Sequence, residues 1–108
     1  MSVSLLVTTR KSDSESDYMI PIATQEVFRL WWKTAAESLG LYWIPLFESG
    51  TTVARGDLPE VINELERLRQ WCLSSEDLRN VILDRIDKLI DELNQISNSN
   101  DEMEVFIG

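Results

Sequence analysis

The chain has 108 residues, 44% of them hydrophobic, and its 10 Lys and Arg against 19 Asp and Glu give a formal net charge of −9 without any histidine. A chain of this length and apolar content can bury one core, so we expect a single domain over residues 1–108 and exclude collagen-like and wholly disordered classes. The acidic balance argues against nucleic acid and anionic membranes as partners, because phosphates repel a surface of the same sign.

The sequence also bears on location. No apolar run approaches the roughly 20 residues that a bilayer-spanning helix needs, and the first residues lack a basic segment followed by a long apolar one. We therefore expect a cytoplasmic protein. The single cysteine, Cys72, cannot form an internal disulfide, and it continues an apolar stripe with Leu65 and Leu68. That position is typical of a small buried side chain rather than of a nucleophile.

The first predicted elements are extended. Val3, Leu5 and Val7 alternate with polar residues, which predicts a half-buried strand over 2–9. Residues 10–17 contain no apolar side chain, so we expect a mobile loop there. Residues 18–22 are apolar again and contain a proline, which favours an edge strand or a packed arm.

A helix is predicted over 25–39, because Thr24 can cap it, apolar residues recur every three to four positions, and Gly40 provides a stop. Residues 41–47 are apolar at every position, which is typical of a strand buried on both faces. Pro45 removes one ladder donor from that strand, so it would need an edge or a bulge. A turn over 48–51 and a short returning strand over 52–54 follow.

Two further helices are expected in the second half. Asp57 and Glu60 have capping-box spacing before a helix over 58–73. Ser74 and Asp77 repeat the signal, which predicts a third helix that starts after almost no loop and folds back on its predecessor. Its apolar seam has spacings of 4, 3, 4 and 3 and consists of Ile82, Ile86, Leu89, Leu93 and Ile96. Residues 103–107 have strand chemistry and must be paired to stay ordered.

The predicted order is therefore β-(arm)-α-β-β-α-α-β. Strands and helices do not alternate regularly, which disfavours a doubly wound parallel sheet. We expect an α+β fold in which a helical layer covers a small mixed or antiparallel sheet.

The absence of histidine removes Ser-His-Asp, Cys-His and His-based zinc sites together. The four glycines are too far apart for a phosphate loop. Carboxylates remain, and Asp84, Asp87 and Asp91 share one helical face, as do Glu60 and Glu64. Such groups can serve as a catalytic pair or bind a hard cation, but an amphipathic helix presents the same pattern to water. We expect no enzyme, no metal and no cofactor.

Charge is unevenly distributed along the chain. Residues 1–56 carry 5 basic and 6 acidic groups, a net −1, whereas residues 57–108 carry 5 basic and 13 acidic groups, a net −8. Such a surface steers a basic partner toward it, or serves only solubility. Trp31 and Trp32 are adjacent on one helix, so their side chains diverge by about 100° and do not face the same core unless the helix is broadly buried.

One stretch resembles a known group of proteins. The aromatic-rich helix from Phe28, the run Tyr42-Trp43-Ile44-Pro45-Leu46-Phe47, and the helix that contains Glu64-Leu65-Glu66 are similar to small bacterial immunity proteins of polymorphic-toxin systems. The resemblance covers residues 28–68. It implies a single-domain α+β protein that binds and neutralises a cognate toxin, and it supplies no catalytic residues.

The resulting hypothesis is a non-catalytic protein-binding module of the immunity type, whose acidic helical face meets a basic partner. The alternatives are a homodimer joined through the seam from Ile82 to Ile96 or through a sheet edge, and then an enzyme that uses carboxylates only. The expected partner contacts are Glu60, Glu64, Asp84, Asp87 and Asp91, with an aromatic anchor among Trp32, Tyr42 and Trp43.

Overall fold

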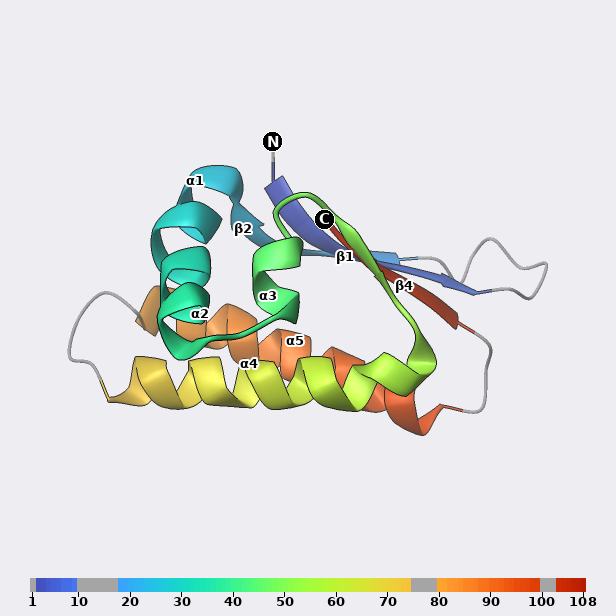
Figure 1. The fold of residues 1–108 in the computed structure, drawn as a ribbon. Coiled ribbons are helices and arrows are strands. Elements are labelled where there is room, and N and C mark those ends of the chain that lie inside the picture. Colours follow the sequence, from blue (N-terminus) through green and yellow to red (C-terminus); the bar gives the residue numbers. More distant parts are fainter. Residues whose placement is uncertain (1, 10–17, 75–79, 100–102) are drawn as a thin grey trace.

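A computed structural model describes residues 2–9, 18–74, 80–99 and 103–108 of the chain (Figure 1). It has an α+β fold, in which helices lie on one side of a four-stranded antiparallel sheet. The strand order is β2-β1-β4-β3. The strands are β1 (Ser2–Thr9), β2 (Tyr18–Thr24), β3 (Thr51–Val53) and β4 (Met103–Ile107). The predicted fold class is confirmed, and the sheet is the antiparallel variant.

The two central strands, β1 and β4, supply most of the buried side chains of the sheet. Val3, Leu5 and Val7 of β1 are at most 2% exposed, and they face the helices together with Val105 and Ile107 of β4. Leu5 pairs with Ile107 and Val7 with Val105 in the antiparallel register. Successive strand residues point to opposite faces, so this register places one apolar set in the core and sends the other outward.

The segment predicted as an edge strand or arm is the edge strand β2. Of the strands that the structure describes, β2 pairs with β1 alone, and the register shifts between Val3 and Ser4. Pro21 is tolerated because one side of an edge strand needs no ladder donor. The carbonyl of Pro21 accepts a hydrogen bond from Arg85 Nη1 at 3.3 Å, which ties this edge to the last long helix.

The first helix runs without a break over residues 25–39, as predicted. It consists of α1 (Gln25–Val27), a π-helical stretch (Phe28–Lys33) and α2 (Thr34–Leu39). Thr24 Oγ1 accepts the Val27 N–H at 3.2 Å, which is the predicted cap. Gly40 adopts φ 72°, and the Leu41 N–H donates to Ala36 O at 2.8 Å, so the helix ends in a Schellman turn. The π-helical stretch was not predicted.

The strand predicted over 41–47 is wrong. The segment contains the short helix α3 (Trp43–Leu46) instead. Leu41, Ile44 and Phe47 are buried while Tyr42 is exposed, so burial recurs every third residue, which is a helical period. Pro45 fits because it lies in the first turn, where N–H groups have no intrahelical acceptor. The return strand is β3, one residue earlier than predicted.

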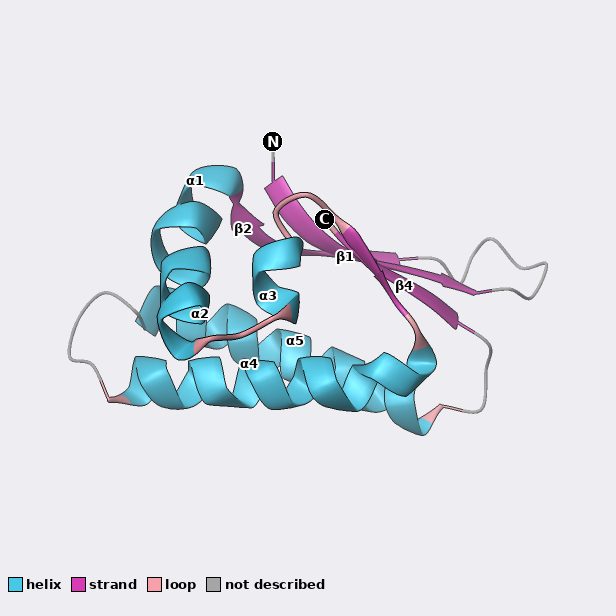
Figure 2. Ribbon diagram, viewed as in Figure 1, coloured by secondary structure: helices cyan, strands magenta, loops and turns pink. Residues whose placement is uncertain are grey.

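The helical hairpin consists of α4 (Leu58–Leu73) and α5 (Asn80–Asn98), which pack side by side (Figure 2). The predicted seams of both helices are buried, and α5 folds back on α4 as expected. The capping box at Asp57 is wrong. Asp57 ends a 3₁₀ turn (Arg55–Asp57), its backbone is already helical, and its side chain makes no cap hydrogen bond.

Two sequence predictions fall on other parts of the chain. The loop over 10–17 and the start signal at Asp77 lie outside the described residues. Among the helices that the structure describes, none combines the length and apolar character needed to span a membrane.

Candidate functional site

The predicted contact residues fall into three separate places. Trp32 lies in the core, Tyr42 and Trp43 meet Glu60 and Glu64 where α3 packs on α4, and the three aspartates line the outer side of α5. The structure therefore assembles four of the eight predicted residues into one cluster.

Trp32 does not serve as a surface anchor in this conformation. It is 0% exposed and stacks on Phe28 with ring centroids 5.9 Å apart and planes 20° apart. Its indole Nε1 has no acceptor among the described residues. The expected role of Trp32 as a partner contact is thus corrected to a role in the core. Trp31 is only partly buried, so the helix presents its two adjacent tryptophans differently, as the 100° rotation between neighbours requires.

Glu64 of α4 caps the short helix α3 from outside. Its carboxylate accepts the Trp43 N–H at 2.8 Å, the Ile44 N–H at 3.2 Å and the Tyr42 N–H at 3.2 Å. The first N–H groups of any helix lack intrahelical acceptors, and α3 has no side-chain cap of its own. A charged acceptor makes such hydrogen bonds about twice as strong as a neutral one does.

Two more side chains of α4 bind the segment that joins α2 to α3. Glu60 Oε2 accepts a hydrogen bond from Trp43 Nε1 at 3.2 Å. Arg67 Nη2 donates to the carbonyl of Leu39 at 3.2 Å, where α2 leaves its last carbonyls unpaired. One face of α4 therefore binds the end of α2 and the start of α3 with side chains of the appropriate sign.

These contacts fix an exposed aromatic pair. Tyr42 stands edge-on to Trp43, with ring centroids 5.6 Å apart and planes 88° apart, and is itself 69% exposed. We call the set Tyr42, Trp43, Glu60, Glu64 and Arg67 the aromatic corner. The expected direct roles of two residues change here. Both oxygens of Glu64 bind the chain's own backbone, and Glu60 uses one oxygen for the indole.

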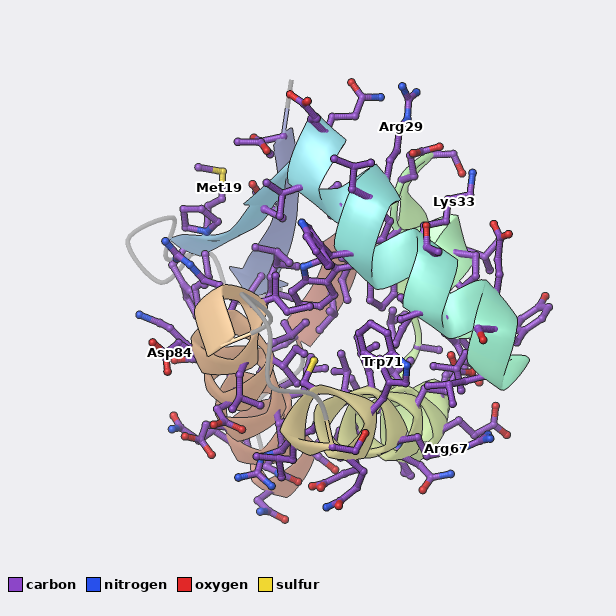
Figure 3. The ribbon with its side chains drawn as sticks, turned by 90° about the vertical axis from the view of Figure 1, so that its left-hand side faces the viewer. Met19, Arg29, Lys33, Arg67, Trp71 and Asp84 are labelled. Atoms are coloured by element: carbon purple, nitrogen blue, oxygen red, sulfur yellow. The ribbon has the colours of Figure 1, made fainter. Side chains whose placement is uncertain are left out.

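The three aspartates of α5 form a separate acidic stripe. Asp87 accepts a hydrogen bond from Arg69 Nε at 2.6 Å, which bridges the two helices of the hairpin. Asp84 and Asp91 are exposed and form no hydrogen bond or ion pair with another described residue. Figure 3 shows Asp84 pointing away from the body of the molecule. Glu66, Arg69, Asp87 and Asp91 line a shallow surface groove.

One charged cluster was not predicted. Glu48, just after α3, accepts a hydrogen bond from Arg29 Nε at 2.7 Å and one from Lys33 Nζ at 3.3 Å. Arg29, followed by Lys33, holds the pKa of Glu48 below its ordinary value. Figure 3 shows both cations on the side of the first helix that faces away from α4. The i, i+4 spacing of Arg29 and Lys33 indicates that both can bind one carboxylate, but only the fold shows that this carboxylate belongs to Glu48.

The two contacts predicted for a homodimer, the helical seam and a sheet edge, are both disfavoured in the folded chain. The seam from Ile82 to Ile96 is buried inside the chain, so it does not offer a joint between copies. The edge strand β2 carries Pro21, and the other edge strand, β3, has three residues. A proline and a very short strand both weaken pairing along an edge.

Within the described ranges, no three carboxylate or thiol groups lie close enough together to hold a metal ion. Comparisons of the chain with protein-family models, with curated proteins and with solved structures give no match.

Proposed function

We propose that this chain is a non-catalytic protein-binding module of the immunity type, which neutralises a basic protein partner. Its contact surface is centred on the aromatic corner. The observation that carries the proposal is that Tyr42, at 69% exposure, is the most exposed large apolar side chain that the structure describes, yet it sits on a tightly bound turn.

Rigidity makes an exposed aromatic useful for binding. Association costs free energy for every side chain and loop that must be ordered. At the aromatic corner that ordering is already present in the free protein, because Glu64 binds three consecutive N–H groups and Glu60 holds the indole. Tyrosine and tryptophan are also the side chains that most often dominate interface energies.

The charges near Tyr42 favour a cationic partner. Glu60 and Glu64 of α4 bind the indole and the backbone of Trp43, which lies edge-on to Tyr42, and they outnumber the one cation of the aromatic corner, Arg67. A lysine or arginine of the partner can therefore lie against the Tyr42 ring and near the carboxylates, where a cation–π contact adds about 0.5–1 kcal/mol at an exposed site. The acidic stripe on α5 adds long-range steering, which raises the rate of encounter.

The proposal is tested with a basic protein partner, taken from an adjacent gene where there is one or otherwise captured from the native lysate. We expect Tyr42→Ala to weaken its binding at least about 30-fold, the equivalent of about 2 kcal/mol. Glu64→Gln should weaken binding as well, because it loosens the turn without removing an aromatic contact. Leu30→Ala is the matched control, since Leu30 is 60% exposed on the outer side of the first helix. Dissociation constants from biolayer interferometry provide the measurement.

Salt dependence supplies the second readout. The association rate should fall as salt rises, and Asp84→Asn with Asp91→Asn should flatten that dependence while changing dissociation little. Equal binding by the Tyr42→Ala and Leu30→Ala variants contradicts the role of the aromatic corner. An acidic cognate partner contradicts the proposed charge complementarity.

A further inference from the structure

The face of the sheet that points away from the helices carries an apolar row over β2, β1 and β4, which Thr52 of β3 extends. Leu6 of β1 pairs with Met19 of β2 on one side and with Phe106 of β4 on the other, and Phe106 pairs with Thr52 of β3. These four residues, which we call the outer row, cross all four strands. Leu6 and Phe106 are each 39% exposed and Met19 is 59% exposed. Figure 3 shows Met19 projecting away from the helices.

This face is poor in charge on a highly charged molecule. The four described strands contain a single charged residue, Glu104, in a chain that is 27% charged. The neighbours of the outer row on the same face include Thr8, which is polar and uncharged, and its pairing partner Glu104, the one charged residue of the described strands. The helices and turns therefore hold the rest of the described charge, and Glu104 is the one carboxylate that the described strands add to this face.

The face is also flat where its largest side chain lies. A Cβ added at Gly50 would approach Phe106 Cζ to 2.6 Å, and one added at Gly108 would approach Phe106 Cε1 to 2.8 Å. The ring of Phe106 thus lies down on the backbone of these two glycines instead of standing out from the sheet. A flat apolar face is the shape that packs against another sheet, at a separation of about 10 Å.

We infer that this outer face pairs with the same face of a second copy of the chain. A contact between identical faces is closed by a two-fold axis, which sets each outer row against its own copy. Two copies with a net charge of −9 repel one another least where both surfaces carry the least charge, and each outer face adds only Glu104 from the described strands. A basic partner is drawn instead to the acidic helices, so the charge pattern favours the second copy here.

The size of the face limits the strength of the dimer. Four strands of eight, seven, three and five residues, spaced about 4.8 Å apart with a rise of about 3.3 Å per residue, define a face of roughly 360 Å² in outline. That is less than half of the roughly 800 Å² per partner of a standard interface. The dimer is therefore weak and reversible, with a dissociation constant on the order of micromolar or above.

The test is sedimentation equilibrium of the full chain from about 1 µM to about 0.5 mM, a range that brackets such a constant. The mass should rise with concentration from the 12.5 kDa monomer toward twice that value. Met19→Glu adds a negative charge to each of the two faces in contact, and it should raise the dissociation constant more than about tenfold. Leu30→Glu adds the same charge at a side chain of equal exposure, 60%, on the first helix, and should leave the constant unchanged within about twofold.

Salt separates this dimer from the proposed partner complex. Raising salt screens the repulsion between two acidic copies and should tighten the dimer, whereas it slows association with a basic partner. A monomer throughout the concentration range overturns the inference. A dimer that responds equally to Met19→Glu and Leu30→Glu, or to neither, also overturns it. None of these outcomes bears on the aromatic corner, because the two surfaces share no residue.

Discussion

Gly40, Gly50 and Gly56 occupy three different backbone environments, and they predict a graded response to alanine. Gly40 has φ 72° with open space around it, so Gly40→Ala should cost about 1 kcal/mol of left-handed strain. Gly50 has φ 94° and lies under Phe106, so Gly50→Ala should cost about 2–4 kcal/mol. Gly56 has neither a positive φ nor a neighbour within 4 Å of an added Cβ, so Gly56→Ala should change the free energy of unfolding by less than about 0.5 kcal/mol.

Urea unfolding of the three variants measures these costs. The comparison is internal, because each substitution adds the same methyl group. A Gly50→Ala variant as stable as the Gly56→Ala variant would mean that Phe106 does not lie on the backbone of Gly50.

Tyr18 predicts a loss of stability at high pH. Its hydroxyl donates to Glu92 Oε2 at 3.2 Å, and burial, together with the Glu92 charge, raises the pKa of Tyr18 from 10.0 to about 12. The raised value favours the protonated phenol in the folded chain. The stabilisation is therefore complete below pH 10 and disappears as the pH rises from 10 to about 12.

Ultraviolet absorbance of the phenolate, taken as the difference between wild type and Tyr18→Phe, gives the titration of this residue. We expect a midpoint near 12 that moves down in a Glu92→Gln variant. A midpoint at the ordinary tyrosine value in the folded wild type would contradict the contact with Glu92.

At the scale of the element, the apolar seam predicts which face of α5 is buried. Ile86 and Leu89 are 0% and 1% exposed, whereas Asp87 is partly exposed and pairs with Arg69. Ile86→Ala and Leu89→Ala should each cost about 2–5 kcal/mol, because each leaves a cavity in the core. Asp87→Ala should cost less than about 1 kcal/mol, the usual range for a solvent-exposed ion pair. Equal free energies of unfolding for all three variants would place the apolar seam on another face.

The elements also show which local signals can be trusted. The bounds of the strand over 2–9 and the helix over 58–73 agree with the prediction because their apolar periods are regular, and those of the strand over 103–107 agree because its residues favour strands. The segment 41–47 lacks polar residues, so its period cannot be read from polarity. Only burial at every third position separates a helix from a strand there, and burial depends on what packs against the segment.

At the scale of the whole molecule, charge and apolar surface are separated. The helices present carboxylates to solvent, and the sheet presents the outer row, which carries no charge. The helical side and the sheet side of the protein should therefore respond to salt in opposite ways. Association with a basic partner should weaken with salt, and self-association should strengthen, so one titration distinguishes the helical side from the sheet side.

The sequence by itself determined the α+β class, the long helices and which of their faces are buried, because periodicity and caps are local properties of the chain. It also excluded histidine chemistry. The tertiary structure alone decided what the charged and aromatic residues do. Glu64 looked like a solvated helix residue, and Trp32 looked no different from its neighbour Trp31. Glu64 caps α3 across 20 or more residues of chain, and Trp32 fills the core. Such roles depend on contacts between distant segments, which no local pattern encodes.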